Sequence, residues 1–249
     1  IPRLDKVQSR DMRNYNNPKS ISETQLLIPS LNIKKMMADK KLKQNVDTLI
    51  VTQPKFISTL NSFLTEHTID DLKTLLRWDT FVSSASRLTE EIEVANWEFY
   101  SKYLRDAKKM RPANERALSV VNNNVGEALG QLYVDAKFPP EAKENAEEMI
   151  ANVIASYQVR IQLLDWMSDE TKTKAIEKLD KFTVKIGYPD IWEDYSTMEI
   201  KKGNTYFENI SAINKWALAK NLSEMGEPVD KTEWGMSPQT VNAYFNPLN

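Results

Sequence analysis

The sequence predicts a mainly α-helical protein with a small β portion at its C-terminal end. Apolar residues recur at helical spacing over long stretches, helix-start signals precede several of these stretches, and strand-like alternation is confined to two short runs. The 249 residues suffice for one large domain or two small ones, and 41% hydrophobic with 27% charged residues is an ordinary globular composition. We therefore expect helices packed around a sizeable core.

Helix-start signals mark the first half of the chain. A hydroxyl residue followed three positions later by an acidic residue is typical of a capping box, and proline suits the first helical position because its missing N–H is not needed there. These signals are Ser20 with Glu23, Pro54, and Thr68 with Asp71. Pro29 interrupts the first helix, and the second is expected to end near Leu64. From Ile69 to about Leu104 there is no Pro or Gly, which predicts one helix of about 35 residues or two with a bend.

Helical patterns continue in the second half, beyond a basic loop at 105–113. They cover Leu118–Val134, an apolar stripe from Ala142 to Leu164, a stretch that starts at Ser168, and Tyr206–Leu222. Gly126 and Gly130 share one face of the first of these patterns, where glycines four residues apart would let a second helix approach closely. The two strand-like runs are Thr183–Pro189 and Thr240–Phe245.

Composition excludes several classes of site. Lys+Arg 33 against Asp+Glu 35 gives a formal net charge of −2, so we expect no nucleic-acid partner and no anionic membrane surface. The absence of cysteine excludes a disulfide framework, a thiolate zinc site and a cysteine nucleophile. There is a single histidine, whereas a zinc hydrolase site usually needs two or three. The sequence has no nucleotide-binding glycine fingerprint, no targeting segment and no apolar run long enough to cross a bilayer.

Other residues that could carry chemistry favour structural roles. His67 lies between two expected helices without a second histidine one turn away, so a helix-boundary role is favoured over a metal ligand. Glu90, Glu91 and Glu93 favour a solvated helix face over an acid/base pair, and the basic residues of 105–111 favour a solvated loop. The dispersed tryptophans favour core anchors over a platform for stacked bases. They are Trp78, Trp97, Trp166, Trp192, Trp216 and Trp234.

One short segment favours binding of an extended peptide. A strand that binds a peptide needs free backbone N–H and C=O groups, a small side chain for access and a nearby amide that both donates and accepts hydrogen bonds. Asn242 and Ala243 meet this description within the strand-like run 240–245. An Asn-Ala pair is common, so from the residues alone the choice between a peptide-binding strand and an ordinary one stays open.

Several ordered blocks of the sequence resemble the neprilysin and endothelin-converting-enzyme family of zinc endopeptidases, and its bacterial PepO-type members in particular. These blocks follow one another in the order of the family and together cover about 120–249. Residues 1–119 fit the family by the order of their elements and by their helical character. The blocks are Asn124–Val134, Leu163–Lys172, Lys185–Asp190, Tyr206–Asn209, Pro228–Trp234 and Thr240–Pro247.

The resemblance implies a two-lobed metallopeptidase of the gluzincin type. Its helical lobe would enclose the substrate and restrict its size, and its thermolysin-like lobe would hold zinc through an HExxH motif. On this basis 1–45 is an irregular leading segment, 46–182 belongs to the helical lobe, and 183–249 passes to the catalytic lobe and ends on its edge strand. Asn242 and Ala243 would hydrogen-bond the main chain of a peptide substrate.

The HExxH motif and the further zinc ligands of that family are missing from these 249 residues. We therefore expect the chain to supply no catalytic residue and no metal ligand, to be inactive alone, and to work with a C-terminal catalytic part of the same enzyme. Features expected at natural termini are absent at both ends, which suggests cuts within a longer chain. The localisation stays open between the bacterial cytoplasm and secretion.

The alternative is a non-catalytic helical interaction module, in which the apolar faces of 69–104 and 141–164 serve a partner. The coding sequence beyond Asn249 separates the two hypotheses. An HExxH motif there supports the peptidase, and a stop codon supports the module.

Overall fold

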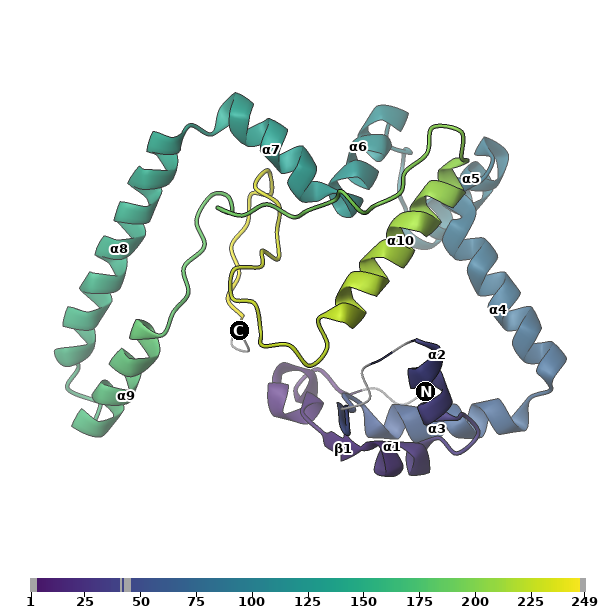
Figure 1. The fold of residues 1–249 in the computed structure, drawn as a ribbon, viewed down its shortest axis with the longest axis horizontal. Helices are drawn as coiled ribbons and strands as arrows, with labels where there is room; N and C mark the ends of the chain where they lie inside the picture. The colour runs from purple at the N-terminus through teal and green to yellow at the C-terminus, as the bar shows by residue number, and fades with distance from the viewer. Residues whose placement is uncertain (1–3, 41, 43–45, 247–249) are drawn as a thin grey trace. The chain divides into compact units, whose positions relative to one another are not determined.

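The structure of the chain is a computed structural model that describes residues 4–40, 42 and 46–246 (Figure 1). The chain forms two compact units. Unit 1 contains the residues up to Met110 together with Met198–Glu227, and unit 2 contains Arg111–Thr197 together with the residues from Pro228 onward. The mainly helical class is confirmed, but the small β portion of the described residues lies within 18–50 and not at the C-terminal end as predicted, and the segment boundaries at 45 and 182 stay a prediction.

Unit 1 begins with short elements around a two-stranded antiparallel sheet, in which Lys19 of β1 lies opposite Leu49 of β2. Ile28 and Val51 are buried next to this sheet and form part of the small core of the unit. The elements are the 3-10 helices η1 (Gln8–Arg10) and η2 (Met12–Tyr15), β1 (Pro18–Ser20), α1 (Ile21–Leu27), α2 (Ile33–Asp39), β2 (Thr48–Ile50) and α3 (Pro54–Glu66).

The predicted helical signals of the first half are confirmed. Ser20 and Glu23 form a complete capping box at the start of α1, and Thr68 and Asp71 form another at the start of α4. Pro54 occupies the first turn of α3. Each signal depends on residues within one helical turn, which explains why the sequence alone identifies it.

The stretch 69–104 is not one helix. It is divided into α4 (Ile69–Ser84), η3 (Ala85–Arg87), α5 (Glu90–Trp97) and η4 (Glu98–Tyr103, a π-helical turn). Leu88 leaves the helical conformation with ψ −146°, and Thr89 is extended with ψ 155°, so a new helix begins after them. Three glutamates in the first turn of α5 favour a helix start at this point, because negative charge stabilises a helix N-terminus. The alternative of two helices with a bend is therefore the correct one.

Helix α10 (Tyr206–Ser223) completes unit 1 and buries Ile210 and Ile213. The start of this helix at Tyr206 is as predicted. It carries a third complete capping box, formed by Thr205 and Glu208, which was not among the predicted cap signals. Its side chains and those of α4 line a shallow, mostly apolar groove that includes Leu76, Phe81 and Phe207.

Unit 2 consists of α6 (Ala113–Asn124), α7 (Gly126–Lys137), α8 (Pro140–Gln162) and α9 (Asp169–Asp180). Helices α8 and α9 pack side by side (Figure 1), and Ser168 caps α9 as predicted. The single helix predicted for 118–134 is wrong. Val125 has φ −138° and ψ 45°, outside the helical region, and separates α6 from α7. Gly126 is thus the first residue of a new helix rather than a weak point within one.

Neither strand-like run of the second half forms a strand. The run 183–189 is irregular and turns at Gly187, whose φ is +73°. The run 240–245 is not a strand either, since no described segment pairs with it. A strand persists only where a neighbouring strand satisfies its backbone groups, and the pattern of side chains cannot supply that neighbour.

Large apolar side chains are often exposed in both units. The fully buried apolar set is small, and the sizeable core expected from the composition is not present among the described residues. Trp78 and Trp166 are 59% and 74% exposed, so the prediction that the tryptophans are core anchors is wrong for these two. On α8 part of the apolar stripe is uncovered: Met149, Val153 and Tyr157 are exposed, whereas Ile150 and Ile154 beside them are half-buried.

Candidate peptide-binding segment

Asn242 and Ala243 are both exposed and lie in the irregular C-terminal segment of unit 2. Their neighbour Val241 is fully exposed. The Ala243 backbone N–H is not free, because it donates to Oδ1 of Asn242 at 2.8 Å. A peptide that pairs with this backbone must therefore displace the Asn242 amide, which is then available to bond the peptide itself.

Two aromatic residues hold the chain directly after this pair. The hydroxyl of Tyr244 accepts a hydrogen bond from the Gly235 N–H at 3.2 Å. Phe245 packs against Phe182 beyond the end of α9, with ring centroids 5.4 Å apart, and Lys178 lies over its face at 5.7 Å. Asn242 and Ala243 thus lie next to attached residues while staying open to solvent. These anchors were not predicted, because they join residues that the sequence pattern does not connect.

The loop before the segment is also held. The side chain of Lys185 donates to the backbone carbonyl of Glu233. Within the loop, the hydroxyl and the backbone N–H of Thr232 both donate to Asp230 and lower the pKa of that carboxyl below its usual range. These hydrogen bonds fix the conformation of the loop that leads into the peptide-binding segment.

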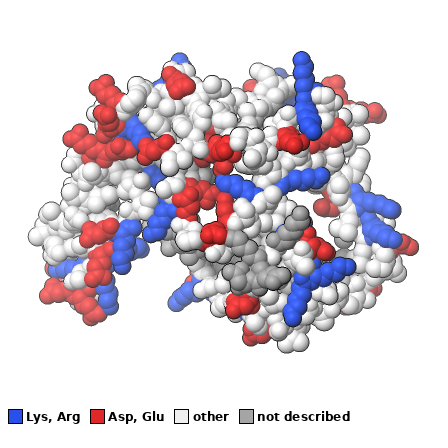
Figure 2. Space-filling view, viewed as in Figure 1, with Lys and Arg blue, Asp and Glu red and all other residues white. Residues whose placement is uncertain are grey.

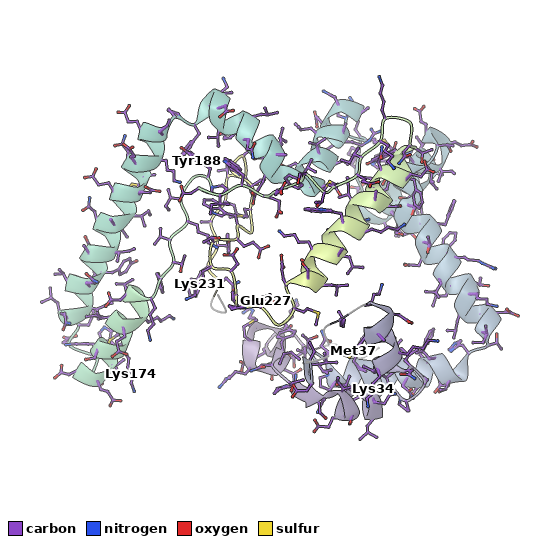
Figure 3. All side chains as sticks on the ribbon, in the orientation of Figure 1. Lys34, Met37, Lys174, Tyr188, Glu227 and Lys231 are labelled. Atoms are coloured by element: carbon purple, nitrogen blue, oxygen red, sulfur yellow. The ribbon has the colours of Figure 1, made fainter. Side chains whose placement is uncertain are left out.

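The turn at Gly187 lies close to this part of unit 2 and is built around Lys143 of α8. The Lys143 ammonium donates to the Tyr188 carbonyl at 3.0 Å and to Asp190 at 2.6 Å, and it lies 4.5 Å from the centre of the Tyr188 ring. Tyr188, labelled in Figure 3, also meets Phe138 edge to face at 5.6 Å. The block 185–190 is consequently a fixed turn at the α7–α8 junction instead of the predicted strand.

The described residues do not offer a zinc site. Among them there is no group of three or more His, Asp or Glu side chains arranged to hold a metal ion. His67 follows α3 in unit 1 and is exposed. Its Nδ1 lies 2.9 Å from the Phe63 carbonyl, and its ring centroid lies 4.3 Å from that of Phe63 with the two rings tilted by 34°. This position confirms a helix-boundary role for the histidine.

Surface charge is mixed where acidic and basic side chains are densest. On α9, at the lower left of Figure 2, they alternate, with ion pairs such as Lys174 to Glu170 at 2.6 Å. Glu90 and Glu91 are exposed at the start of α5, and Lys108 pairs with Asp106 in the loop that follows η4. Within the described ranges, no helix is both long and apolar enough to span a membrane.

Comparison with known proteins decides the family. The profile of the N-terminal part of peptidase family M13 matches residues 2–189, which is most of the chain. The chain belongs to peptidase family M13. The resemblance to neprilysin-like zinc peptidases is therefore confirmed. Relatives include human neprilysin, 32% identical over 213 residues, and a neutral endopeptidase of Lactococcus lactis, 28% identical over 221 residues.

Solved M13 structures share the fold. The open state of the zinc metalloprotease Zmp1 of Mycobacterium tuberculosis is 32% identical, with a TM-score of 0.85 over 98% of this chain. PepO of Lactobacillus rhamnosis is 23% identical with a TM-score of 0.83 over 95% of the chain, a likeness that concerns the fold alone. This chain spans 28% of human neprilysin, 35% of the Lactococcus endopeptidase and 38% of the Zmp1 chain. It therefore corresponds to less than half of the length of these relatives.

Proposed function

We propose that this chain is part of a zinc-dependent endopeptidase that hydrolyses small to medium peptides. Within it, the helices form the lobe that limits substrate size, and Asn242 and Ala243 bind the substrate main chain. Membership of a family whose relatives are named as endopeptidases and zinc metalloproteases supports the activity. The observation that carries the binding role is the exposed Asn242–Ala243 pair, which lies next to the anchored residues Tyr244 and Phe245.

The division of labour follows from the residues present. Because the described side chains form no metal site, zinc and the group that activates water would come from another part of the same enzyme. The chemistry left to this chain is positioning. A carboxamide can donate to a peptide carbonyl and accept from a peptide N–H, so Asn242 can hold both groups of one substrate residue. Holding the peptide extended brings the scissile bond to a fixed place, which raises the rate without any bond being made by this segment.

The test uses the full-length gene product and the variant Asn242→Ala. Two hydrogen bonds of ordinary strength contribute about 1–3 kcal/mol, so kcat/KM for peptides should fall by about 5- to 150-fold. Zinc content should stay unchanged, because Asn242 holds no metal under this proposal. Asn221→Ala, an exposed asparagine on α10, is the matched control and should leave turnover unchanged. Loss of zinc in Asn242→Ala, or unchanged turnover, would refute the binding role.

The size limit is tested separately with peptides of increasing length that share one cleavage sequence. Turnover should drop sharply above a limiting length, because an enclosing lobe excludes bulk rather than sequence. A full-length product that contains no zinc and cleaves no peptide would instead support the helical interaction module. The exposed apolar faces of α4 and α8 would then be its binding surfaces.

A further inference from the structure

We propose that Gln239 is a positioning residue that fixes the peptide-binding segment to the junction of α6 and α7. Gln239 lies three residues before Asn242, in the segment that reaches α7 and turns back toward the C-terminus in Figure 1. The proposal rests on the proposed function of Asn242 and Ala243 and adds the residue that determines where they stand.

The amide of Gln239 bonds both helices of the junction. Its Nε2 donates to Oδ1 of Asn122, in the last turn of α6, at 2.5 Å, and to the backbone carbonyl of Gly126, at the start of α7, at 3.0 Å. More than 100 residues of chain separate these partners from Gln239. The break at Val125 brings an α6 side chain and an α7 carbonyl within reach of one donor group. The contact is therefore specific to this helix junction.

The two glycines of α7 allow the segment to lie against the helix. A Cβ atom at Gly130 would be 2.6 Å from Cδ of Pro238 and 3.1 Å from Oε1 of Gln239. A Cβ atom at Gly126 would be 3.2 Å from Cβ of Ser237. These glycines were predicted to admit a second helix, and that prediction is wrong. The structure instead shows the segment 237–239 in this place.

A short turn carries the attachment toward the binding pair. The Thr240 N–H donates to the Ser237 carbonyl at 2.9 Å, and the two hydroxyls of these residues lie 3.3 Å apart. Two residues later the chain reaches Asn242, and Tyr244 and Phe245 hold it on the other side. Because the chain is attached both before and after the exposed pair, the backbone at Asn242 and Ala243 can adopt few conformations. Without the Gln239 side chain, the segment before Asn242 loses its hydrogen bonds to α6 and α7. Asn242 would then become ordered only when substrate binds.

The decisive experiment is a double-mutant cycle on peptide turnover by the full-length gene product. Gln239→Ala should lower kcat/KM about 10-fold when Asn242 is present, chiefly through a higher KM, because a looser segment binds peptide less well. In an Asn242→Ala background the same change should lower kcat/KM by less than about 3-fold, because the group that Gln239 positions is gone. A role in stability alone would give the same factor in both backgrounds.

Asn122 tests the same contact from the helix side. Asn122→Leu removes the acceptor and should reproduce the effect of Gln239→Ala, whereas Asn122→Asp keeps an acceptor oxygen and should retain near-normal KM. Gln158→Ala is the matched control, since Gln158 also donates through Nε2, to Asp180 at 2.8 Å, but on the exposed surface of α8 and α9. It should leave KM unchanged. If Gln239→Ala does not fold, the Leu and Asp variants at 122 carry the test.

The outcomes separate the two proposals. If Asn242→Ala lowers turnover but Gln239→Ala and Asn122→Leu do not, the positioning role of Gln239 is overturned while the binding role stands. Equal factors in both backgrounds overturn it as well. If Asn242→Ala itself has no effect on turnover, the proposed binding role of the segment is refuted, and the positioning role of Gln239 that rests on it is refuted too.

Discussion

Replacing Gly187 by alanine should destabilise the protein more than any other Gly→Ala change outside the α7 contact. Two costs coincide at this residue. Its φ of +73° lies in the left-handed region, where an L side chain costs about 1–2 kcal/mol. A Cβ atom would also lie 2.6 Å from Cε1 of Phe138, and overpacking of this kind costs about 1–3 kcal/mol. The reduced entropy of the unfolded chain returns about 0.4–1 kcal/mol, which leaves a net loss of about 1–4.5 kcal/mol.

Two other glycines separate these costs. Gly226 has φ +81° with open space where the alanine methyl group would lie, so Gly226→Ala carries the backbone cost alone and should lose about 1 kcal/mol net. Gly203 has open space and no left-handed φ, so Gly203→Ala should be neutral or stabilising by up to about 1 kcal/mol. The measurement is the urea unfolding midpoint of the full-length gene product. If Gly187→Ala lowers the midpoint no more than Gly226→Ala does, an alanine Cβ at 187 does not clash with the Phe138 ring, and the reasoning is refuted.

Two further predictions concern polar contacts. Lys143→Met keeps the aliphatic part of the side chain but removes the hydrogen bonds to the Tyr188 carbonyl and to Asp190, and it should lower the free energy of unfolding in urea by about 1–3 kcal/mol. Asp190→Asn should lower it by less than about 1 kcal/mol, because the Asp190 carboxylate is exposed. Equal losses in the two variants would contradict the conclusion that the bond to the Tyr188 carbonyl contributes most. Hydrogen bonds from the Thr68 hydroxyl and backbone lower the pKa of Asp71 below its usual 3.8, so its stabilising effect is complete above that pH and is lost as the pH falls through the lower folded value. The difference in unfolding midpoint between wild type and Asp71→Asn should therefore shrink from pH 6 to pH 2.5, and a constant difference would contradict the cap.

Local signals were predictable from the sequence, and long-range contacts were not. The capping boxes at Ser20 and Thr68 depend on side chains three residues apart, which a sequence displays directly. The break at Leu88 was left open between one helix and two, although the acidic turn after Thr89 is a start signal. The break at Val125 has no such signal, because neither proline nor a capping side chain marks it.

The candidate site divides in the same way. The identity of Asn242 and Ala243 came from residue chemistry and family resemblance, and their exposure agrees with a binding role without testing it. The strand expected around them is absent from the described part of the chain, since strand pairing needs a partner that a residue pattern does not name. Gln239, Tyr244 and Phe245 anchor the segment through contacts with residues distant in the sequence, two by hydrogen bonds and Phe245 by packing of its ring. Such contacts could be found only in the structure.

The apolar stripe of α8 shows why the experiments require the full-length gene product. Met149, Val153 and Tyr157 recur at every fourth residue, and this spacing correctly predicted one apolar face. The spacing does not predict which part of the protein covers this apolar face, and the described residues leave these three side chains exposed. Burying one such side chain fully contributes about 1.5–3 kcal/mol, so the uncovered stripe represents stability that these residues do not realise among themselves. An absolute stability measured on the 249 residues alone would therefore include the cost of exposing this face, whereas that cost cancels in the difference between matched variants.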